Sequence, residues 1–171
     1  MEKIKNLNEL EKLRILIESE MKQEKSFISI CAGTGCRASG SEIVIDAFKE
    51  EIKFLGLQKK VEVKVTGCHG FCEKGPMVVI HPGNIFYQNV EKEDILEIVS
   101  ETIIGGKIID RLLYVDPNTG KKIKKESDVP FYSKQKRIIL GNNGTIDPTN
   151  IKDYIGLGGY TALGTVLSEM K

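Results

Sequence analysis

Apolar side chains recur every three or four residues in several stretches of the chain, a spacing that predicts amphipathic helices. The clearest stretch covers residues 40–55. It begins where Ser39 and Glu42 form a capping-box pattern, and it ends before Gly56. Similar spacing predicts helices over residues 7–24 and 91–104.

Shorter apolar runs lie between these helices and predict strands. Residues 61–65 alternate valine with polar side chains, which is typical of a half-buried strand. Residues 27–30 form another β-branched run, and residues 77–80 and 85–87 flank a turn, which predicts a β-hairpin. The expected order is a helix followed by β-α-β-β-β-α. This is an α/β fold in which a right-handed crossover makes the first two strands parallel.

The pattern changes after residue 106. Residues 112–125 predict a small exposed hairpin or linker with too few apolar residues for a core. Residues 137–140 then predict a strand, and residues 147–154 and 161–170 predict two further helices. The expected segments of the chain are residues 1–106, 107–136 and 137–171.

The net charge and the lengths of the apolar runs weigh against several classes of protein. The formal net charge of the 171 residues is +1, which gives no general attraction to nucleic acid or to an anionic membrane. The basic run at residues 121–125 is therefore expected to be a solvated face of the hairpin, with partner docking as the next alternative. No apolar run approaches the roughly 18 residues of a membrane span, and residues 1–6 do not resemble a secretory leader. We expect a cytoplasmic protein, in which thiols stay reduced.

All four cysteines lie in two close pairs, Cys31 with Cys36 and Cys68 with Cys72. Each pair follows one of the two predicted parallel strands, so both cysteine loops are expected at the same edge of the sheet. Four thiols that converge in a reducing compartment favour one shared metal centre over two disulfides.

The spacing of the cysteines bears on which metal they bind. Zinc knuckles usually have two residues between paired cysteines, whereas the gaps here are four and three residues. Glycines in the two loops would let backbone N–H groups approach a 2Fe-2S cluster; these are Gly33, Gly35, Gly67 and Gly70. A 2Fe-2S cluster is therefore favoured. A zinc-binding structural or adaptor module is one alternative, and a thiol-disulfide oxidoreductase, whose C-x-x-C motif is missing, is the other.

Three other features have plainer interpretations. His69 lies between two cysteines and is expected to face solvent, because four thiols already saturate a cluster, and His81 is expected to be part of a turn. Pro76 stands ahead of a strand where a cis peptide bond is an alternative to the usual trans bond. The glycine-rich residues 156–164 follow no strand, so they predict a loop between helices and not a dinucleotide site.

Residues 27–104 resemble the thioredoxin-like 2Fe-2S ferredoxin domain, whose motif is C-x4-C, a gap of some thirty residues, and C-x3-C followed by Gly-Pro. The matching positions are Cys31, Cys36, Cys68, Cys72, Gly75 and Pro76. The resemblance implies a thioredoxin-like ferredoxin fold that transfers single electrons. It also implies that the first cysteine pair binds one iron and the second pair binds the other.

The C-terminal part resembles the join into the NADH-binding flavoprotein subunit of complex I-like dehydrogenases and of NAD(P)-linked, electron-bifurcating iron hydrogenases. The similar runs are Asp116-Pro-Asn-Thr-Gly-Lys121, Pro130-Phe-Tyr132, Ile146-Asp-Pro148 and Gly158-Gly-Tyr-Thr-Ala-Leu163. Relatives often have cysteine where Asn143 stands. This resemblance implies that residues 107–136 are a linker and that residues 137–171 begin an incomplete flavoprotein domain.

That assignment carries expectations about cofactors and partners. FMN and NAD(P)H are expected only in a full-length subunit, because the glycine-rich segment that binds them does not occur before Lys171. We therefore expect no NADH oxidation by this chain alone. The expected partners are other subunits of an NAD(P)H-linked oxidoreductase or hydrogenase, with a homodimer as a further assembly.

Overall fold

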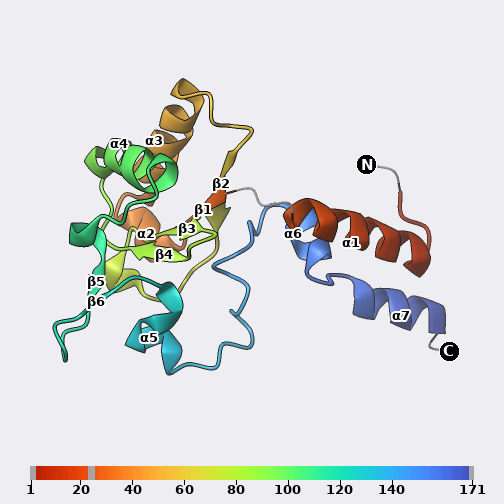
Figure 1. Cartoon of the computed structure of the whole chain (residues 1–171). Helices are drawn as coiled ribbons and strands as arrows, with labels where there is room; N and C mark the ends of the chain where they lie inside the picture. Colours follow the sequence, from red (N-terminus) through yellow and green to blue (C-terminus); the bar gives the residue numbers. More distant parts are fainter. Residues whose placement is uncertain (1–2, 23–25, 170–171) are drawn as a thin grey trace. The chain divides into compact units, whose positions relative to one another are not determined.

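The structure is a computed structural model that describes residues 3–22 and 26–169 (Figure 1). The described chain divides into two compact units. Residues 26–146 form the larger unit, and the described residues before 23 and from 147 onward form the smaller one. The larger unit includes residues 107–133, whose apolar side chains pack on its sheet.

A four-stranded sheet is the centre of the larger unit (Figure 1). Its strands are β1 (Ser26–Cys31), β2 (Val61–Thr66), β3 (Val78–His81) and β4 (Ile85–Tyr87), in the order β2-β1-β3-β4. β1 and β2 are parallel, with Ile30 opposite Val65, whereas β3 is antiparallel to both β1 and β4. The predicted strands, the parallel pair and the hairpin are therefore confirmed.

Two helical segments cover one face of this sheet (Figure 1). The first is α3 (Ser41–Phe54). The second runs without a break from η2 (Lys92–Asp94) through α4 (Ile95–Glu97) into η3 (Ile98–Ile104), and η3 is a π-helix. Phe48 and Ile98 from these helices pack with Ile28 and Ile80 of the sheet in the main core. This burial confirms the apolar stripes predicted for both helices.

The start of α3 differs from the prediction. Gly40 is the N-cap residue, with a left-handed φ of 92°, and no side chain caps the helix. The Ser39 hydroxyl instead donates to the Gly35 carbonyl of α2 (Thr34–Ala38), a short helix that the sequence pattern did not indicate. The predicted capping box is therefore wrong, because Ser39 ends one helix and does not begin the next.

Residues 107–133 pack on both faces of the sheet: Ile109, Leu112 and Leu113 are buried in the main core, and the residues from Tyr114 onward cover the opposite face. They include η4 (Asp110–Leu112), the predicted hairpin β5 (Tyr114–Val115) and β6 (Lys122–Ile123), η5 (Glu126–Asp128) and α5 (Pro130–Ser133). Tyr114, Val129 and Tyr132 are buried with Val79 and Phe86 in a second core. The expectation that this stretch builds no core is therefore wrong. The predicted strand at residues 137–140 is also wrong, since these residues form no strand and Ile139 is 90% exposed.

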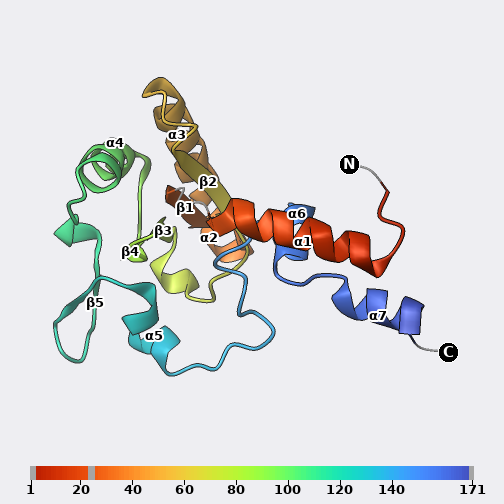
Figure 2. The same ribbon diagram turned by 45° about the vertical axis from the view of Figure 1, so that its right-hand side comes forward.

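The smaller unit is helical (Figure 2). It contains α1 (Leu7–Lys22), α6 (Ile151–Gly156) and α7 (Thr161–Glu169), with a core of Leu10, Ile17 and Ile155. The helix expected from residue 147 begins at residue 151, because Asn150 caps it by accepting a hydrogen bond from the Lys152 N–H group. The middle of the glycine-rich stretch, residues 157–160, forms the predicted loop between helices, whereas residues 161–164 belong to α7. No helix within residues 3–22 and 26–169 is long and apolar enough to cross a membrane.

Candidate metal centre

The four cysteines occupy the ends of the two parallel strands, as the crossover predicted. Cys31 is the last residue of β1 and Cys36 lies in α2, whereas Cys68 follows β2 and Cys72 opens η1 (Cys72–Lys74). All four thiols are free. The first pair is buried, whereas Cys68 is partly exposed and Cys72 is exposed. One side of the centre therefore faces the protein core and the other faces solvent.

The two cysteine loops interlock through glycines of the first loop. A Cβ atom built on Gly33 would lie 2.9 Å from Cys68 Cβ, and one built on Gly35 would lie 2.9 Å from Cys72 Sγ. Contacts this short exclude any larger side chain unless the neighbouring backbone moves. The structure therefore brings the two cysteine pairs together.

The other glycines act in different ways. Gly70 has a φ of +92° and its N–H group donates to Cys68 Sγ at 3.3 Å, so it shapes the second loop. Gly67 lies against the Asn143 side chain and not against a sulfur. Gly75, at the cis Gly75-Pro76 bond, makes the close approach to a sulfur that was expected of Gly67.

The sulfurs associate as two pairs. Interaction between the two thiols is the main cause of the pKa shifts of Cys31 and Cys36, and interaction with Cys72 is a smaller cause of the pKa shift of Cys68. A structural zinc ion needs four ligands around one point, whereas a 2Fe-2S cluster takes two thiolates on each of two irons. This donor set of two adjacent thiol pairs fits the cluster better than it fits zinc.

The buried pair has one thiol that ionises easily. The hydrogen bond from Cys36 lowers the pKa of Cys31 to about 5, although burial acts in the opposite direction. The same hydrogen bond, together with burial, raises the pKa of Cys36. Burial also raises the pKa of Cys68. Because the thiolate is the form that binds metal, a hydrogen bond within this pair favours the ionisation of one of its two thiols.

Backbone groups near the buried pair favour its ionised form. Hydrogen bonds from the backbone of His69 and Gly33 lower the pKa of Cys31, and one from the backbone of Met77 lowers the pKa of Cys36. Such hydrogen bonds withdraw charge from ligand sulfur and are one of the means by which a protein sets the potential of an iron-sulfur cluster.

The structure corrects the interpretation of His69. This side chain was expected to face solvent, but it is fully buried. Its Nε2 atom lies 2.9 Å from Thr66 Oγ1, and its Nδ1 atom lies 2.6 Å from Glu126 Oε1. The expectation failed because Glu126, which lies 57 positions further along the chain, supplies a partner that no local pattern indicates.

The other histidine, His81, ends β3 and precedes the hairpin turn. Its ring stacks on Phe27 with centroids 3.9 Å apart, and its Nε2 atom lies 3.1 Å from Ser29 Oγ. Burial lowers the pKa of His81. This histidine is therefore a packing residue of the sheet.

Aromatic side chains of residues 107–133 cover the second cysteine loop. Phe71, which precedes Cys72, stacks on Phe131 with ring centroids 4.4 Å apart. Tyr132 meets the Phe71 ring edge-on at 6.0 Å, and its hydroxyl donates to Met77 Sδ at 3.6 Å. Sequence reasoning did not place these residues at the site, although the aromatic run Pro130-Phe-Tyr132 offered a signal.

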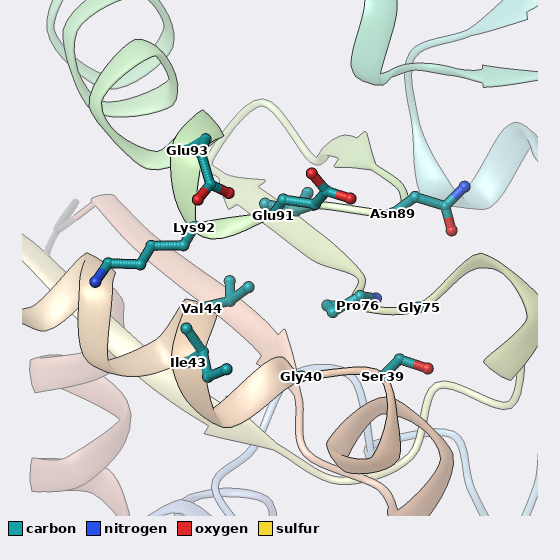
Figure 3. A pocket seen from close by; sticks show the side chains of 11 residues that line it. Ser39, Gly40, Ile43, Val44, Gly75, Pro76, Asn89, Glu91, Lys92 and Glu93 are labelled. Carbon is teal, nitrogen blue, oxygen red and sulfur yellow. The ribbon is translucent and has the colours of Figure 1, made fainter.

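A hollow of about 640 Å³ opens on the surface where α3 begins (Figure 3). Ile43 and Val44 form one side, Gly75 and Pro76 another, and residues 89–93 a third. No thiol or imidazole lines it, so it is not the metal centre. Since a Cβ on Gly75 would lie 2.7 Å from Cys36 Sγ, a single glycine separates this hollow from the buried cysteine pair.

Comparisons with known proteins agree with this geometry. The family model of thioredoxin-like [2Fe-2S] ferredoxins matches residues 19–102. A 2Fe-2S ferredoxin of Clostridium pasteurianum is 34% identical over 102 residues, which cover 54% of this chain and 98% of that protein. The solved thioredoxin-like [2Fe-2S] ferredoxin of Aquifex aeolicus has a TM-score of 0.51 at 28% identity, and the match covers 58% of this chain and 99% of that one.

A more distant relative is the NADP-reducing hydrogenase subunit HndA of Solidesulfovibrio fructosivorans. It is 31% identical over 78 residues, which cover 43% of this chain and 44% of that subunit. The family match, the ferredoxin relatives and the paired thiols together confirm the predicted fold and cofactor. The chain belongs to the thioredoxin-like [2Fe-2S] ferredoxin family, and its cofactor is a 2Fe-2S cluster.

Proposed function

We propose that the chain carries one electron at a time through a 2Fe-2S cluster bound by Cys31, Cys36, Cys68 and Cys72. In this assignment the first pair binds one iron and the second pair binds the other. The observation that carries the proposal is the interlocking of the two loops, in which Gly33 and Gly35 lie against Cys68 and Cys72.

The chain's own groups would determine how such a cluster behaves. A bound 2Fe-2S cluster supplies a one-electron redox couple. The burial of Cys31 and Cys36 would exclude water from one side of the cluster, and the backbone of His69 and Met77, which lowers the pKa values of these thiols, would favour negative charge on their sulfurs. The exposed Cys72 marks the side from which a redox partner can approach.

We also propose that this carrier works in the cytoplasm as part of a multi-subunit NAD(P)H-dependent oxidoreductase, of the complex I-like or hydrogenase type. Two observations support this context: the similarity to a subunit of an NADP-reducing hydrogenase, and the flavoprotein-like runs from Asp116 to Leu163. The partners would be other subunits of that complex. FMN and NAD(P)H would bind to a complete flavoprotein domain, of which residues 137–171 are the proposed beginning.

The test is to purify the full chain without oxygen and to measure iron, acid-labile sulfide and zinc. The proposal expects two irons and two sulfides per chain, a red-brown colour, and an EPR signal after dithionite reduction. One zinc per chain in a colourless protein would contradict it. A metal-free protein that reduces insulin disulfides would also contradict it, although the burial of Cys31 and Cys36 already restricts thiol exchange with a substrate.

The oxidoreductase context needs a separate test, since a cluster alone does not identify the partner. The as-purified chain should not oxidise NADH or NADPH with an artificial acceptor. Its cluster should be reduced by NAD(P)H once a flavoprotein subunit of a complex I-like or hydrogenase complex is added. If such a subunit never reduces the cluster, the proposed context is wrong even where the cluster is present.

A further inference from the structure

Charge is divided unevenly between the ferredoxin domain and the residues that follow it. Residues 26–106 contain eleven Asp and Glu residues against eight Lys and Arg residues, whereas residues 107–137 contain four against nine. This extension is therefore strongly basic, although the whole chain has a formal net charge of only +1. The extension lies beyond residues 19–102, where the ferredoxin family model matches, so its charge is a feature added to the ferredoxin domain.

Four of the positive charges lie on the hairpin of β5 and β6. These residues, Lys121, Lys122, Lys124 and Lys125, are all exposed and line an open hollow of about 510 Å³. Lys122 pairs with Asp110 at 3.1 Å, whereas the other three form no ion pair with any residue in 3–22 and 26–169. The turn of the hairpin projects away from the sheet in both views (Figures 1 and 2). The four lysines, here called the basic hairpin surface, therefore face solvent with most of their charge uncompensated.

The alternation of side chains along the hairpin explains how this surface is supported. Ile123 of β6 pairs with Tyr114 of β5, and both residues pack in the second core. Successive side chains of a strand point to opposite faces, so Lys122 and Lys124 point away from that core. The Lys124 carbonyl also accepts a hydrogen bond from the Phe86 N–H group of β4 at 2.8 Å. The lysines are thus presented by a hairpin that is attached to the sheet.

The inner face of the same hairpin reaches the cover of the second cysteine loop. The Tyr114 ring lies against Phe71 with centroids 5.7 Å apart. Phe71 directly precedes Cys72, which is the exposed thiol of the metal centre. A protein bound to the basic hairpin surface would therefore lie beside the residues that flank the exposed cysteine.

We propose that the basic hairpin surface docks an acidic electron-transfer protein, which exchanges single electrons with the cluster. This inference rests on the proposed function and adds to it the kind of partner. In the exchange, the reduced cluster loses one electron and returns to its oxidised state, while the redox centre of the partner gains that electron. No covalent bond forms or breaks. Opposite charge increases the rate at which the two proteins meet, and it orients the partner toward the hairpin.

Two features favour a protein partner over nucleic acid. The surface contains only lysines, which act as point charges, and it has no arginine of the kind that binds a phosphate through two parallel hydrogen bonds. Residues 26–106 carry more acidic than basic side chains, so they repel a long polyanion that extends beyond the hairpin. An acidic protein can instead place a limited patch of carboxylates on the hairpin alone.

The experiment uses the full chain with its cluster reduced, and two one-electron acceptor proteins as probes. Oxidised rubredoxin is an acidic acceptor, and oxidised cytochrome c is a basic one. The test variant combines Lys121→Gln with Lys124→Gln. The matched control combines Lys49→Gln with Lys53→Gln, which removes the same charge from exposed positions of α3. Stopped-flow absorbance gives the second-order rate constant at ionic strengths of about 20 mM and about 200 mM.

Rubredoxin is expected to oxidise the unmodified chain roughly tenfold faster at the lower ionic strength, because salt screens the attraction. The hairpin variant should lose most of this advantage, and the α3 variant should keep it. Cytochrome c should react with the hairpin variant at least as fast as with the unmodified chain. A rate that does not depend on salt, equal losses in the two variants, or a slower reaction of the hairpin variant with cytochrome c would each overturn the inference.

Cross-linking separates a failure of this inference from a failure of the proposed function. A carbodiimide joins a lysine amine to a carboxylate in contact with it and takes up the water that is lost, and this reaction needs no cluster. Mass spectrometry of apoprotein cross-linked to rubredoxin is expected to find Lys121, Lys124 or Lys125, and not Lys49 or Lys53. If the chain carries no cluster but these hairpin lysines are cross-linked, the proposed function fails and the docking of an acidic protein holds.

Three other results would assign the surface differently and overturn the inference. Cross-links to rubredoxin that fall mainly on α3 would place the docking surface elsewhere. Cross-links mainly between two copies of the chain would make the hairpin a self-association surface. Binding of single-stranded DNA that the hairpin variant loses, at about 150 mM salt, would identify nucleic acid as the partner.

Discussion

Gly75 lies directly against the sulfur of Cys36. A Cβ atom at position 75 would be 2.7 Å from Cys36 Sγ, closer than non-bonded carbon and sulfur can approach. The glycine therefore belongs to the metal centre as a spacer, although it offers no ligand atom.

This relationship predicts the effect of Gly75→Ala. The added methyl group must displace Cys36 Sγ or the backbone beside it, at a cost of about 1–3 kcal/mol, and we expect cluster occupancy to fall. Iron and sulfide content per chain measures the effect. Gly120→Ala is the control. Its φ of +68° strains the backbone in open space, so it should lose stability but keep its cluster. Equal cluster loss in both variants would contradict the spacer role.

Replacing a proposed ligand should affect the cluster more than the fold. Cys68→Ser is expected to remove the cluster or to shift its visible and EPR spectra, because a hydroxyl is a weaker ligand than a thiolate. The same change at each of the other three cysteines extends the test. A variant whose spectrum is unchanged would remove that cysteine from the ligand set.

The aromatic cover should contribute to stability. Phe131→Ala removes the ring stacked on Phe71, and we expect the free energy of unfolding of the apoprotein to fall by roughly 1–3 kcal/mol. Urea denaturation measures this change. Phe54→Ala is the matched control, because that ring is 83% exposed and its removal should change stability by less than about 0.5 kcal/mol. If the two variants lose the same stability, the cover does not hold the loop.

The burial of His81 predicts a dependence of stability on pH. Burial lowers the pKa of His81 below its ordinary value of 6.5, so the unfolded chain binds a proton more readily than the folded one. The contribution of this group is therefore fully present above about pH 6.5 and is lost as the pH falls below that value.

The variant His81→Phe isolates that contribution, since phenylalanine keeps the stacking on Phe27 but cannot be protonated. When the pH is lowered from about 7.5 to about 5 at about 25 °C, the free energy of unfolding should fall more for the unmodified apoprotein than for the variant. Parallel pH profiles for the two proteins would show that His81 does not titrate on unfolding.

Local sequence pattern and chain topology determined most of the helices and strands of this protein and the positions of its cysteines. The spacing of apolar residues in α3 and the alternation in β2 depend on neighbours within a few positions, so both elements could be predicted from the sequence. The handedness of the crossover then placed Cys31 and Cys68 at the same edge of the sheet, since each follows one of the two parallel strands. The spacing of the cysteines was enough to favour a 2Fe-2S cluster.

Contacts between residues far apart in the sequence decided how the cysteine loops are buried and covered. Glu126 reaches His69 across 57 positions, and Phe131 stacks on Phe71 from a segment that was expected to be an exposed linker. Neither contact has a periodic or local signature, because each depends on where the chain returns after the ferredoxin domain ends. The sequence by itself therefore determined the two cysteine loops and their convergence. Only the tertiary structure decided which side chains bury and hold those loops, because burial follows from packing between segments and not from the order of residues within one.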